Sequence, residues 1–251
     1  MNFNLNNLPA REKKPRKNGL TMVMDKGLSL NEAKNLISSS SDQIDLIKLG
    51  FGTSIITPNL VEKIDLYQKQ NIKVFFGGTL FESFIARNSF NEYTELIKKF
   101  NIKTVEISDG CIDLDHDVKC NFINKLAKSC TVLSEVGSKD EEVELTPEKW
   151  IELLNKELNA GSWKVITESR ESGNIGLFKN DHKVKSSLIQ NIINNVPKDS
   201  ILWEAPKKSQ QVWFIKTIGP NVNIGNISPD EVISLECLRL GLRADTFFEF
   251  L

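Results

Sequence analysis

The chain has 251 residues, of which 40% are hydrophobic and 26% charged, a composition that excludes a disordered protein. Its formal net charge is −1, so it lacks the overall positive charge with which proteins attract nucleic acids or anionic membranes. We therefore expect no nucleic-acid partner and no membrane partner, and any anionic ligand must be held by a local site.

The first 18 residues form an Asn-rich segment that has neither a helical nor a strand period. Basic residues cluster within it, at Arg11, Lys13, Lys14, Arg16 and Lys17. We predict that residues 1–18 form a flexible, solvated arm and that residues 19–251 form a single catalytic domain.

From residue 19 onward, short apolar runs alternate with longer amphipathic stretches, without an intervening linker. The runs are too short to be buried helices, and their continuous apolar character suits parallel strands that are covered on both faces. Eight runs are predicted as strands: Leu20–Met24, Asp45–Leu49, Lys73–Phe76, Thr104–Ser108, Val132–Val136, Lys164–Thr167, Ile201–Glu204 and Val222–Gly225.

Helix-start signals recur between the runs. The capping-box pattern, in which a hydroxyl and a carboxylate three residues later satisfy free amides, occurs at Ser29, Thr79 and Ser228. Two further starts combine threonine with proline, at Thr57-Pro58 and Thr146-Pro147. Apolar residues at three- and four-residue spacing predict helices that include Leu60–Lys69, Asn91–Phe100 and Glu148–Asn159.

Eight strands, each followed by a helix-length segment, predict an α/β fold, a single-domain (β/α)8 TIM barrel. An open, doubly wound parallel sheet is the alternative. No GxGxxG motif follows the first predicted strand, which disfavours both that alternative and a dinucleotide-binding role.

The cysteines and the hydropathy indicate the compartment. Cys111, Cys120, Cys130 and Cys237 show neither CxxC pairing nor a histidine at zinc-finger spacing, so we expect reduced structural thiols. No apolar run approaches the roughly 20 residues needed to span a bilayer, and no secretory signal is evident. We expect a cytoplasmic protein.

Polar residues stand at the ends of nearly all predicted strands, and Glu106 interrupts the fourth. In a barrel, these positions form the active-site face. Burying many charges there is costly unless they pair with one another or engage a metal and a charged ligand. The positions are Asp25, Lys26, Lys48, Gly77, Gly78, Thr79, Asp109, Glu135, Lys139, Glu168, Arg170, Glu204 and Asn226.

Two features predict the kind of ligand. The turn Gly77-Gly78-Thr79 leads directly into a predicted helix, whose free amides and positive dipole end suit a phosphate or carboxylate. The loop around Gly173 allows a similar close approach of the backbone. The surplus of carboxylates over histidine and cysteine favours magnesium over zinc. We therefore predict a site for a small, multiply charged anion together with Mg²⁺.

Several segments are characteristic of one family. They read GLTMVMDKGLSL, IDLIKLGFGTS, FFGGTLFE, VEISDG, LSEVGSK, ESRESGNIGLF, EAPKKSQQVWFI and NVNIGNISPDEVISLECLRLGLRADTF. In these segments, which cover nearly the whole chain in family order, the sequence resembles the phosphosulfolactate synthases. The resemblance implies a magnesium-dependent (β/α)8 barrel that makes (2R)-phospho-3-sulfolactate from phosphoenolpyruvate and sulfite, as in the synthesis of coenzyme M or sulfolactate.

The resemblance also implies roles for single residues. Lys139 matches the second lysine of the family segment EVGKK, whose first lysine is replaced here by Ser138, and it is the expected proton donor. The positions of the other polar residues at the strand ends, rather than the resemblance, give their expected roles. The expected metal-binding residues are Asp25, Glu135, Glu168 and Glu204. The expected substrate-binding residues are Lys26, Lys48, Gly77, Gly78, Thr79, Arg170, Gly173 and Asn226.

Two alternatives remain open at this point. Another barrel lyase that acts on a phosphorylated small acid, such as a Schiff-base aldolase, would need a lysine inside the barrel, and Lys48 is available. A non-catalytic, heat-stress-associated barrel protein of the same family would retain the fold for binding. An outer helix with exposed apolar positions could also support a homo-oligomer.

Overall fold

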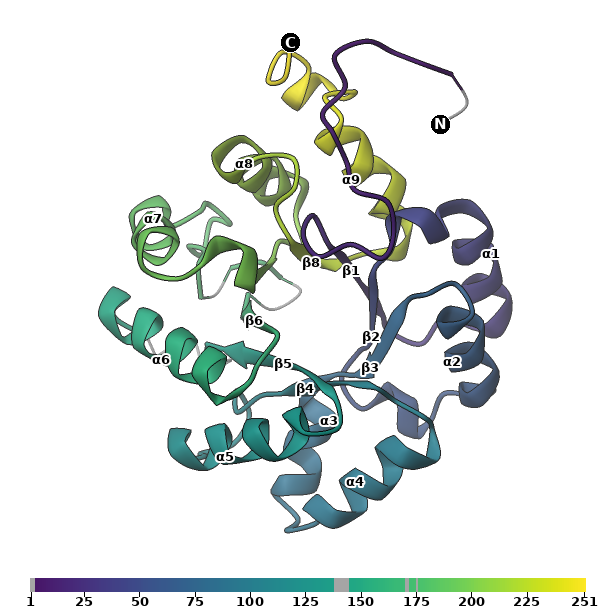
Figure 1. Cartoon of the computed structure of the whole chain (residues 1–251), viewed down its shortest axis with the longest axis vertical. Coiled ribbons are helices and arrows are strands. Elements are labelled where there is room, and N and C mark those ends of the chain that lie inside the picture. The colour runs from purple at the N-terminus through teal and green to yellow at the C-terminus, as the bar shows by residue number, and fades with distance from the viewer. Residues whose placement is uncertain (1–2, 138–144, 170–171, 175) are drawn as a thin grey trace.

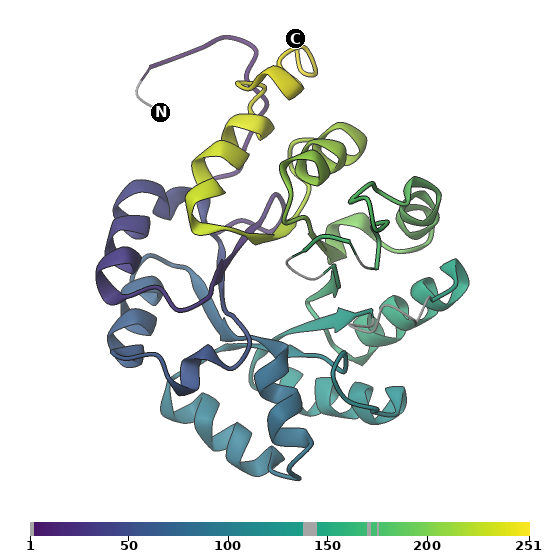
Figure 2. The same cartoon turned by 180° about the vertical axis from the view of Figure 1, so that it is seen from behind.

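The computed structural model describes residues 3–137, 145–169, 172–174 and 176–251. Within these ranges, eight strands form the centre of the molecule and the helices surround them (Figure 1). The view from behind shows the same ring of helices on the outside (Figure 2). In the described part of the chain, no helix is both long enough and apolar enough to cross a membrane.

The strands form one parallel sheet that curls into a nearly closed barrel. Its hydrogen-bonded order is β3-β2-β1-β8-β7-β6-β5-β4, and β3 and β4 lie side by side where the ring closes (Figure 1). This cyclic order confirms the predicted (β/α)8 barrel and excludes the doubly wound sheet, in which the order reverses at a switch point. The strands are β1 (Thr21–Asp25), β2 (Leu46–Leu49), β3 (Lys73–Phe76), β4 (Thr104–Ile107), β5 (Thr131–Val136), β6 (Lys164–Thr167), β7 (Ile201–Glu204) and β8 (Ile224–Ile227).

Helices cover the outer face of the ring, and the main apolar core lies between them and the strands. A smaller core fills the barrel interior and consists of Leu20, Met22, Leu46, Phe75, Leu133, Ile166 and Leu202. The helices are α1 (Leu30–Ser40), α2 (Leu60–Gln68), α3 (Gly78–Ile85), α4 (Phe90–Lys99), α5 (His116–Ala127), α6 (Pro147–Ala160), α7 (Ser186–Asn195), α8 (Lys208–Ile218) and α9 (Val232–Arg239).

Two of the predicted helix starts are confirmed. Ser29 and Glu32 form a capping box at α1, and the Thr146 side chain accepts from a free amide in the first turn of α6. The predicted start at Thr57-Pro58 is wrong, since α2 begins at Leu60, after a left-handed Asn59.

The other two capping boxes are also wrong. Helix α3 begins one residue before Thr79, because the Gly78 N–H donates to the Glu106 carboxylate on the neighbouring strand β4 (2.8 Å). At Ser228 the chain makes a 3-10 turn, and the serine hydroxyl donates to Asp230 instead of capping a helix. In both places a nearby acidic side chain competes with the local pattern.

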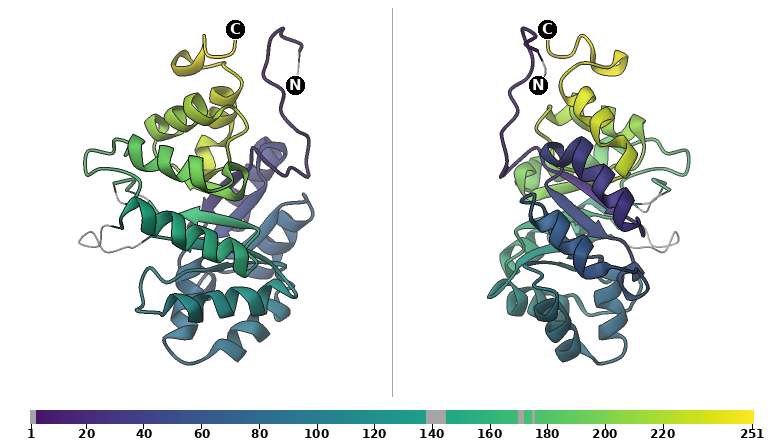
Figure 3. Two further views of the ribbon diagram at one scale, coloured as in Figure 1. Left: turned by 60° about the vertical axis from the view of Figure 1, so that its left-hand side comes forward. Right: turned by 90° about the vertical axis from the view of Figure 1, so that its right-hand side faces the viewer.

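The N-terminal arm runs beside the C-terminal end of the chain (Figure 3). The prediction that its basic residues are solvated is wrong for two of them. Arg11 Nε lies 2.9 Å from Glu236 Oε1, and Arg16 Nη1 lies 3.0 Å from Asp45 Oδ1, with both arginine side chains less than 10% exposed. Lys13, in contrast, is exposed. Ion pairs to the body of the barrel therefore bury part of the arm.

Candidate active site

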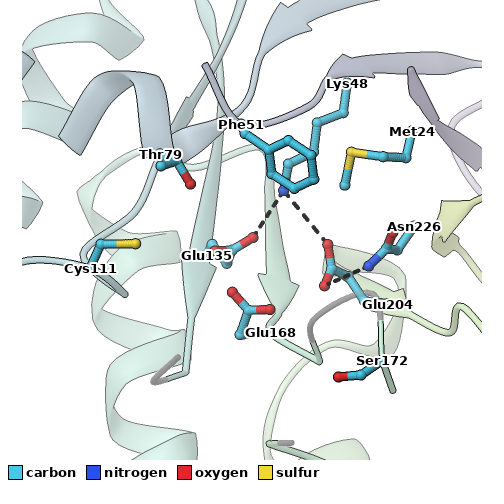
Figure 4. A pocket seen from close by; sticks show the side chains of 10 residues that line it. All are labelled: Met24, Lys48, Phe51, Thr79, Cys111, Glu135, Glu168, Ser172, Glu204 and Asn226. Carbon is cyan, nitrogen blue, oxygen red and sulfur yellow. Dashed lines mark hydrogen bonds and ion pairs between the residues drawn. The ribbon is translucent and has the colours of Figure 1, made fainter. Parts of the chain in front are cut away.

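A cavity of about 450 Å³ opens at the carboxyl ends of the strands, where barrel enzymes have their active sites. Each strand, or the segment that follows it, contributes to the lining (Figure 4). The lining residues are Met24, Lys48, Phe51, Thr79, Cys111, Glu135, Glu168, Ser172, Glu204 and Asn226.

The alternation of side chains along the strands explains this lining. Successive residues of a strand point to opposite faces, so residues two positions apart share a face. Lys48, Glu135 and Glu204 each follow a leucine of the interior core by two positions. The barrel interior is therefore apolar below and charged at its mouth.

Lys48 is the centre of the charged layer. Its Nζ lies 2.9 Å from Glu106 Oε1, 3.1 Å from Glu135 Oε2 and 3.6 Å from Glu204 Oε1. Burial by itself lowers the pKa of Lys48, but the surrounding carboxylates outweigh burial and raise that pKa well above its ordinary value. The ammonium of Lys48 therefore stays charged at neutral pH.

Glu106 belongs to this cluster, although it is absent from the predicted site residues. One of its oxygens accepts from the Gly78 N–H and also faces Lys48, while no hydrogen bond to Oε2 is found among the described residues. Burial raises the pKa of Glu106 to about 7, with the charge of Lys48 acting in the opposite direction. A glutamate inside an otherwise apolar strand was the sequence signal for this position.

Three further carboxylates line the cavity directly, from Glu135, Glu168 and Glu204 (Figure 4). All three are at least 97% buried. Glu204 Oε2 accepts from the Ser169 N–H (3.2 Å) and from Asn226 Nδ2 (3.4 Å), which orients it. Among the described residues of this cluster, carboxylates outnumber ammonium groups.

The donor chemistry of the cavity fits Mg²⁺, a hard cation that prefers oxygen ligands. In the described part of the chain, no three His, Cys, Asp or Glu side chains form a ready-made metal cage. Magnesium is commonly held by one or two carboxylates, with waters and substrate oxygens completing its shell. Glu135, Glu168 and Glu204 can supply such a partial set.

Asp25 does not join this cluster. It is completely buried, and its Oδ1 accepts from the amides of Gly27 (2.9 Å) and Leu28 (2.8 Å). Its Oδ2 lies 2.8 Å from Lys63 Nζ and accepts from the Tyr67 hydroxyl (2.9 Å). Because four donors on the helix side of β1 surround the carboxylate, we assign Asp25 a structural role in place of the predicted metal-binding one.

The predicted substrate-binding side chains that the structure describes lie in two adjoining cavities. Lys48, Thr79 and Asn226 line the cavity. Lys26 lies in an adjoining cavity of about 320 Å³, which also has Asn226 in its wall. Four of the predicted substrate-binding residues therefore lie in the active-site cavity or in the cavity beside it.

The three predicted glycines have backbone roles. The Gly78 amide is already bonded to Glu106, so it is not free for a phosphate. The Gly77 amide donates to the Leu49 carbonyl (2.9 Å), and the carbonyl of Gly173, which has φ +64°, accepts from Gln210 Nε2 (2.7 Å).

The predictions for Lys139 and Arg170 lie outside the described residues. The described chain reaches Gly137 just after β5 and Ser169 just after β6. Both positions are close in sequence to carboxylates of the cavity.

Comparisons with known proteins point to a single family. The family model described as (2R)-phospho-3-sulfolactate synthase (ComA) matches residues 9–245. Phosphosulfolactate synthase of Methanothermobacter thermautotrophicus is 41% identical, over 95% of this chain and 95% of its own length. That of Bacillus subtilis is also 41% identical, over 96% and 97%. The Arabidopsis thaliana protein HEAT-STRESS-ASSOCIATED 32 is 21% identical, over 91% and 88%.

Solved structures share the fold at low sequence identity. One is 3-hexulose-6-phosphate synthase of Salmonella typhimurium, with a TM-score of 0.58 and 15% identity, over 89% of this chain and 100% of that one. Another is a phosphonopyruvate hydrolase complex with oxalate and Mg²⁺, with a TM-score of 0.53 and 10% identity, over 86% and 77%. These likenesses support the barrel fold.

Proposed function

The chain belongs to the (2R)-phospho-3-sulfolactate synthase family, and from this premise we propose that it adds sulfite to phosphoenolpyruvate, giving (2R)-phospho-3-sulfolactate. The observation that carries the proposal within this chain is the buried group of Lys48, Glu106, Glu135 and Glu204 at the barrel mouth. We further propose that the product serves coenzyme M or sulfolactate synthesis.

The charge of the cavity supports a metal cofactor. Both proposed substrates are anions, and a cavity rich in carboxylates would repel them unless a cation lay between. We propose that Glu135, Glu168 and Glu204 hold Mg²⁺, directly or through water. Such an ion would act as a Lewis acid toward the substrate carboxylate.

The contacts of Lys48 define its part in this scheme. An ammonium has three donor hydrogens, and the Lys48 ammonium faces three carboxylates, from Glu106, Glu135 and Glu204. It therefore fixes the directions of these carboxylates. We propose that the anionic groups of the substrates contact Lys26, which lies in the adjoining cavity, and Arg170, which follows β6 in the sequence.

The proposed reaction balances with one added proton. The sulfur lone pair of sulfite forms a bond to the methylene carbon of phosphoenolpyruvate, and the electrons of the double bond move toward the carboxylate. A proton is then added to the carbon that bears the phosphate. We propose Lys139 as the donor of this proton, since it matches the catalytic lysine of the family.

Two observations weigh against the alternatives. A Schiff-base aldolase needs a neutral amine, whereas the pKa of Lys48 is raised by its carboxylate neighbours. The chain is 41% identical to two phosphosulfolactate synthases but 21% identical to the heat-stress-associated protein. An enzymatic role is therefore favoured.

A direct assay tests the proposal. Purified protein is incubated with phosphoenolpyruvate, sulfite and Mg²⁺, and the phosphorus NMR signal of the product is followed. Matched reactions replace sulfite with sulfate, or Mg²⁺ with EDTA, and neither should form product. Absence of the product in the complete mixture, with protein shown to be folded by circular dichroism, would refute the proposal.

A further inference from the structure

Another buried lysine, Lys119, lies behind β5, on the side opposite the cavity. Lys119 is in the first turn of α5 and its side chain is 1% exposed. Its Nζ lies 2.7 Å from Glu157 Oε1 on α6 and 2.8 Å from Asp109 Oδ1 after β4. It also donates to the main-chain carbonyl of Glu135 (2.6 Å).

The Lys119 ammonium donates hydrogen bonds to Asp109 and to the Glu135 carbonyl, and it forms an ion pair with Glu157. Burial by itself lowers the pKa of Lys119, but the charges of Glu157 and Asp109 outweigh burial and raise it. The lysine therefore stays charged at neutral pH, and it joins two helices to the ends of two strands. It lines a separate cavity of about 210 Å³ and is not among the residues that line the active-site cavity.

The contact with Glu135 connects this cluster to the proposed chemistry. Glu135 is held from both sides, because its carboxylate faces the Lys48 ammonium and its carbonyl accepts from Lys119. Just beyond it, Gly137 has φ +131°, and a Cβ at this position would lie 2.7 Å from the Glu168 Cβ. The chain thus turns tightly at the point where it leaves β5 toward the segment that contains Lys139.

We propose that Lys119 is a positioning residue for the reaction, which holds the end of β5 so that the Glu135 carboxylate keeps a fixed place at the cavity. This inference rests on the proposed function, since that function gives Glu135 its role in the reaction. The competing explanation is that the Lys119–Glu157 pair stabilises the packing of α5 on α6 and does nothing for turnover.

Two variants separate these explanations. Lys119→Met removes the contact with the Glu135 carbonyl, whereas Glu157→Gln removes a charge partner and leaves that contact in place. Lys119→Met alone leaves the buried Glu157 carboxylate without its ion-pair partner. The double variant Lys119→Met/Glu157→Gln avoids this, because residue 157 is then a neutral amide. Urea unfolding of all variants identifies a temperature and pH at which each is fully folded, and kcat and KM for phosphoenolpyruvate are then measured there.

We expect Lys119→Met, alone and in the double variant, to lower kcat by about 10- to 100-fold, the usual effect of losing a group that orients a reacting or metal-binding residue. In Lys119→Met, KM for phosphoenolpyruvate should change by less than about 3-fold. Glu157→Gln should keep kcat within about 3-fold of wild type, because a change in stability alone leaves the turnover of the folded enzyme intact.

The inference is overturned if Lys119→Met retains wild-type kcat while folded, or if Glu157→Gln lowers kcat as much as Lys119→Met does. It is likewise overturned if the double variant recovers wild-type turnover. Wild-type protein that makes no product would instead overturn the proposed function, so the two failures are distinguishable.

Discussion

Glu106 makes the stability of this protein depend on pH. Burial raises the pKa of Glu106 to about 7, above the ordinary glutamate value of 4.5, so the folded protein takes up a proton here at a pH where the unfolded chain does not. The stabilisation that this proton uptake gives is present below pH 4.5 and is lost as the pH rises toward 7. At about 1.36 kcal/mol per pKa unit, the gap corresponds to about 3 kcal/mol.

The replacement Glu106→Gln tests this value because it keeps the size of the side chain and an oxygen that can accept from the Gly78 amide. The free energy of unfolding is measured by urea titration at pH 5 and pH 8 in the presence of EDTA. Wild type should lose up to about 3 kcal/mol more than the variant between these two pH values. Subtracting the two proteins cancels the contribution of every group that titrates alike in both.

The variant Glu157→Gln provides a second, independent test, since burial also raises the pKa of Glu157 to about 7. It should remove a pH-dependent loss of similar size, and the combination Glu106→Gln/Glu157→Gln should remove both, because the two carboxylates belong to different clusters. An unfolding free energy that changes equally with pH in wild type and in Glu106→Gln would refute the reasoning.

Three further predictions concern other parts of the molecule. Lys139→Ala should lower kcat by about 10²–10⁴-fold without altering the circular dichroism spectrum, and near-normal turnover would remove Lys139 from the mechanism. Asp25→Asn should lower the free energy of unfolding in urea by about 3 kcal/mol, because Lys63 loses its buried partner. The same variant should leave the Mg²⁺ concentration for half-maximal activity unchanged. A large increase in that concentration would show that Asp25 is a metal ligand after all. Arg11→Ala should lower the thermal midpoint by removing the ion pair with Glu236, and an unchanged midpoint would show that the arm does not stabilise the barrel.

The fold was predictable because each strand has a short, continuous apolar run, which is required when helices cover one face and the barrel interior the other. The interior of the site was less predictable. Met24 and Asp25 are neighbours at the end of β1, yet only Met24 lines the cavity. Counting the alternation of side chains from Met22 in the interior core would have placed Asp25 on the helix side.

The helix starts show a different limit of sequence reasoning. The threonine and glutamate after Gly78 match a capping box, but Glu106, 28 residues away in sequence, satisfies the Gly78 amide instead. A local pattern cannot reveal a partner from a neighbouring strand. The same contact occupies the Gly78 amide, which we had predicted to bind phosphate. The pairing of Glu106 with Lys48 depends in the same way on the closure of the barrel.

The two buried lysines on either side of β5 restrict the choice of proton donor. Lys48 and Lys119 each face three oxygens, and the pKa of each is raised by its carboxylate neighbours. A general acid is most effective when its pKa lies near the working pH, so neither ammonium is suited to release a proton to the substrate. Their arrangement suits a different task, which is to fix Glu135 from both sides. The proton for the proposed reaction must then come from a group other than these two lysines.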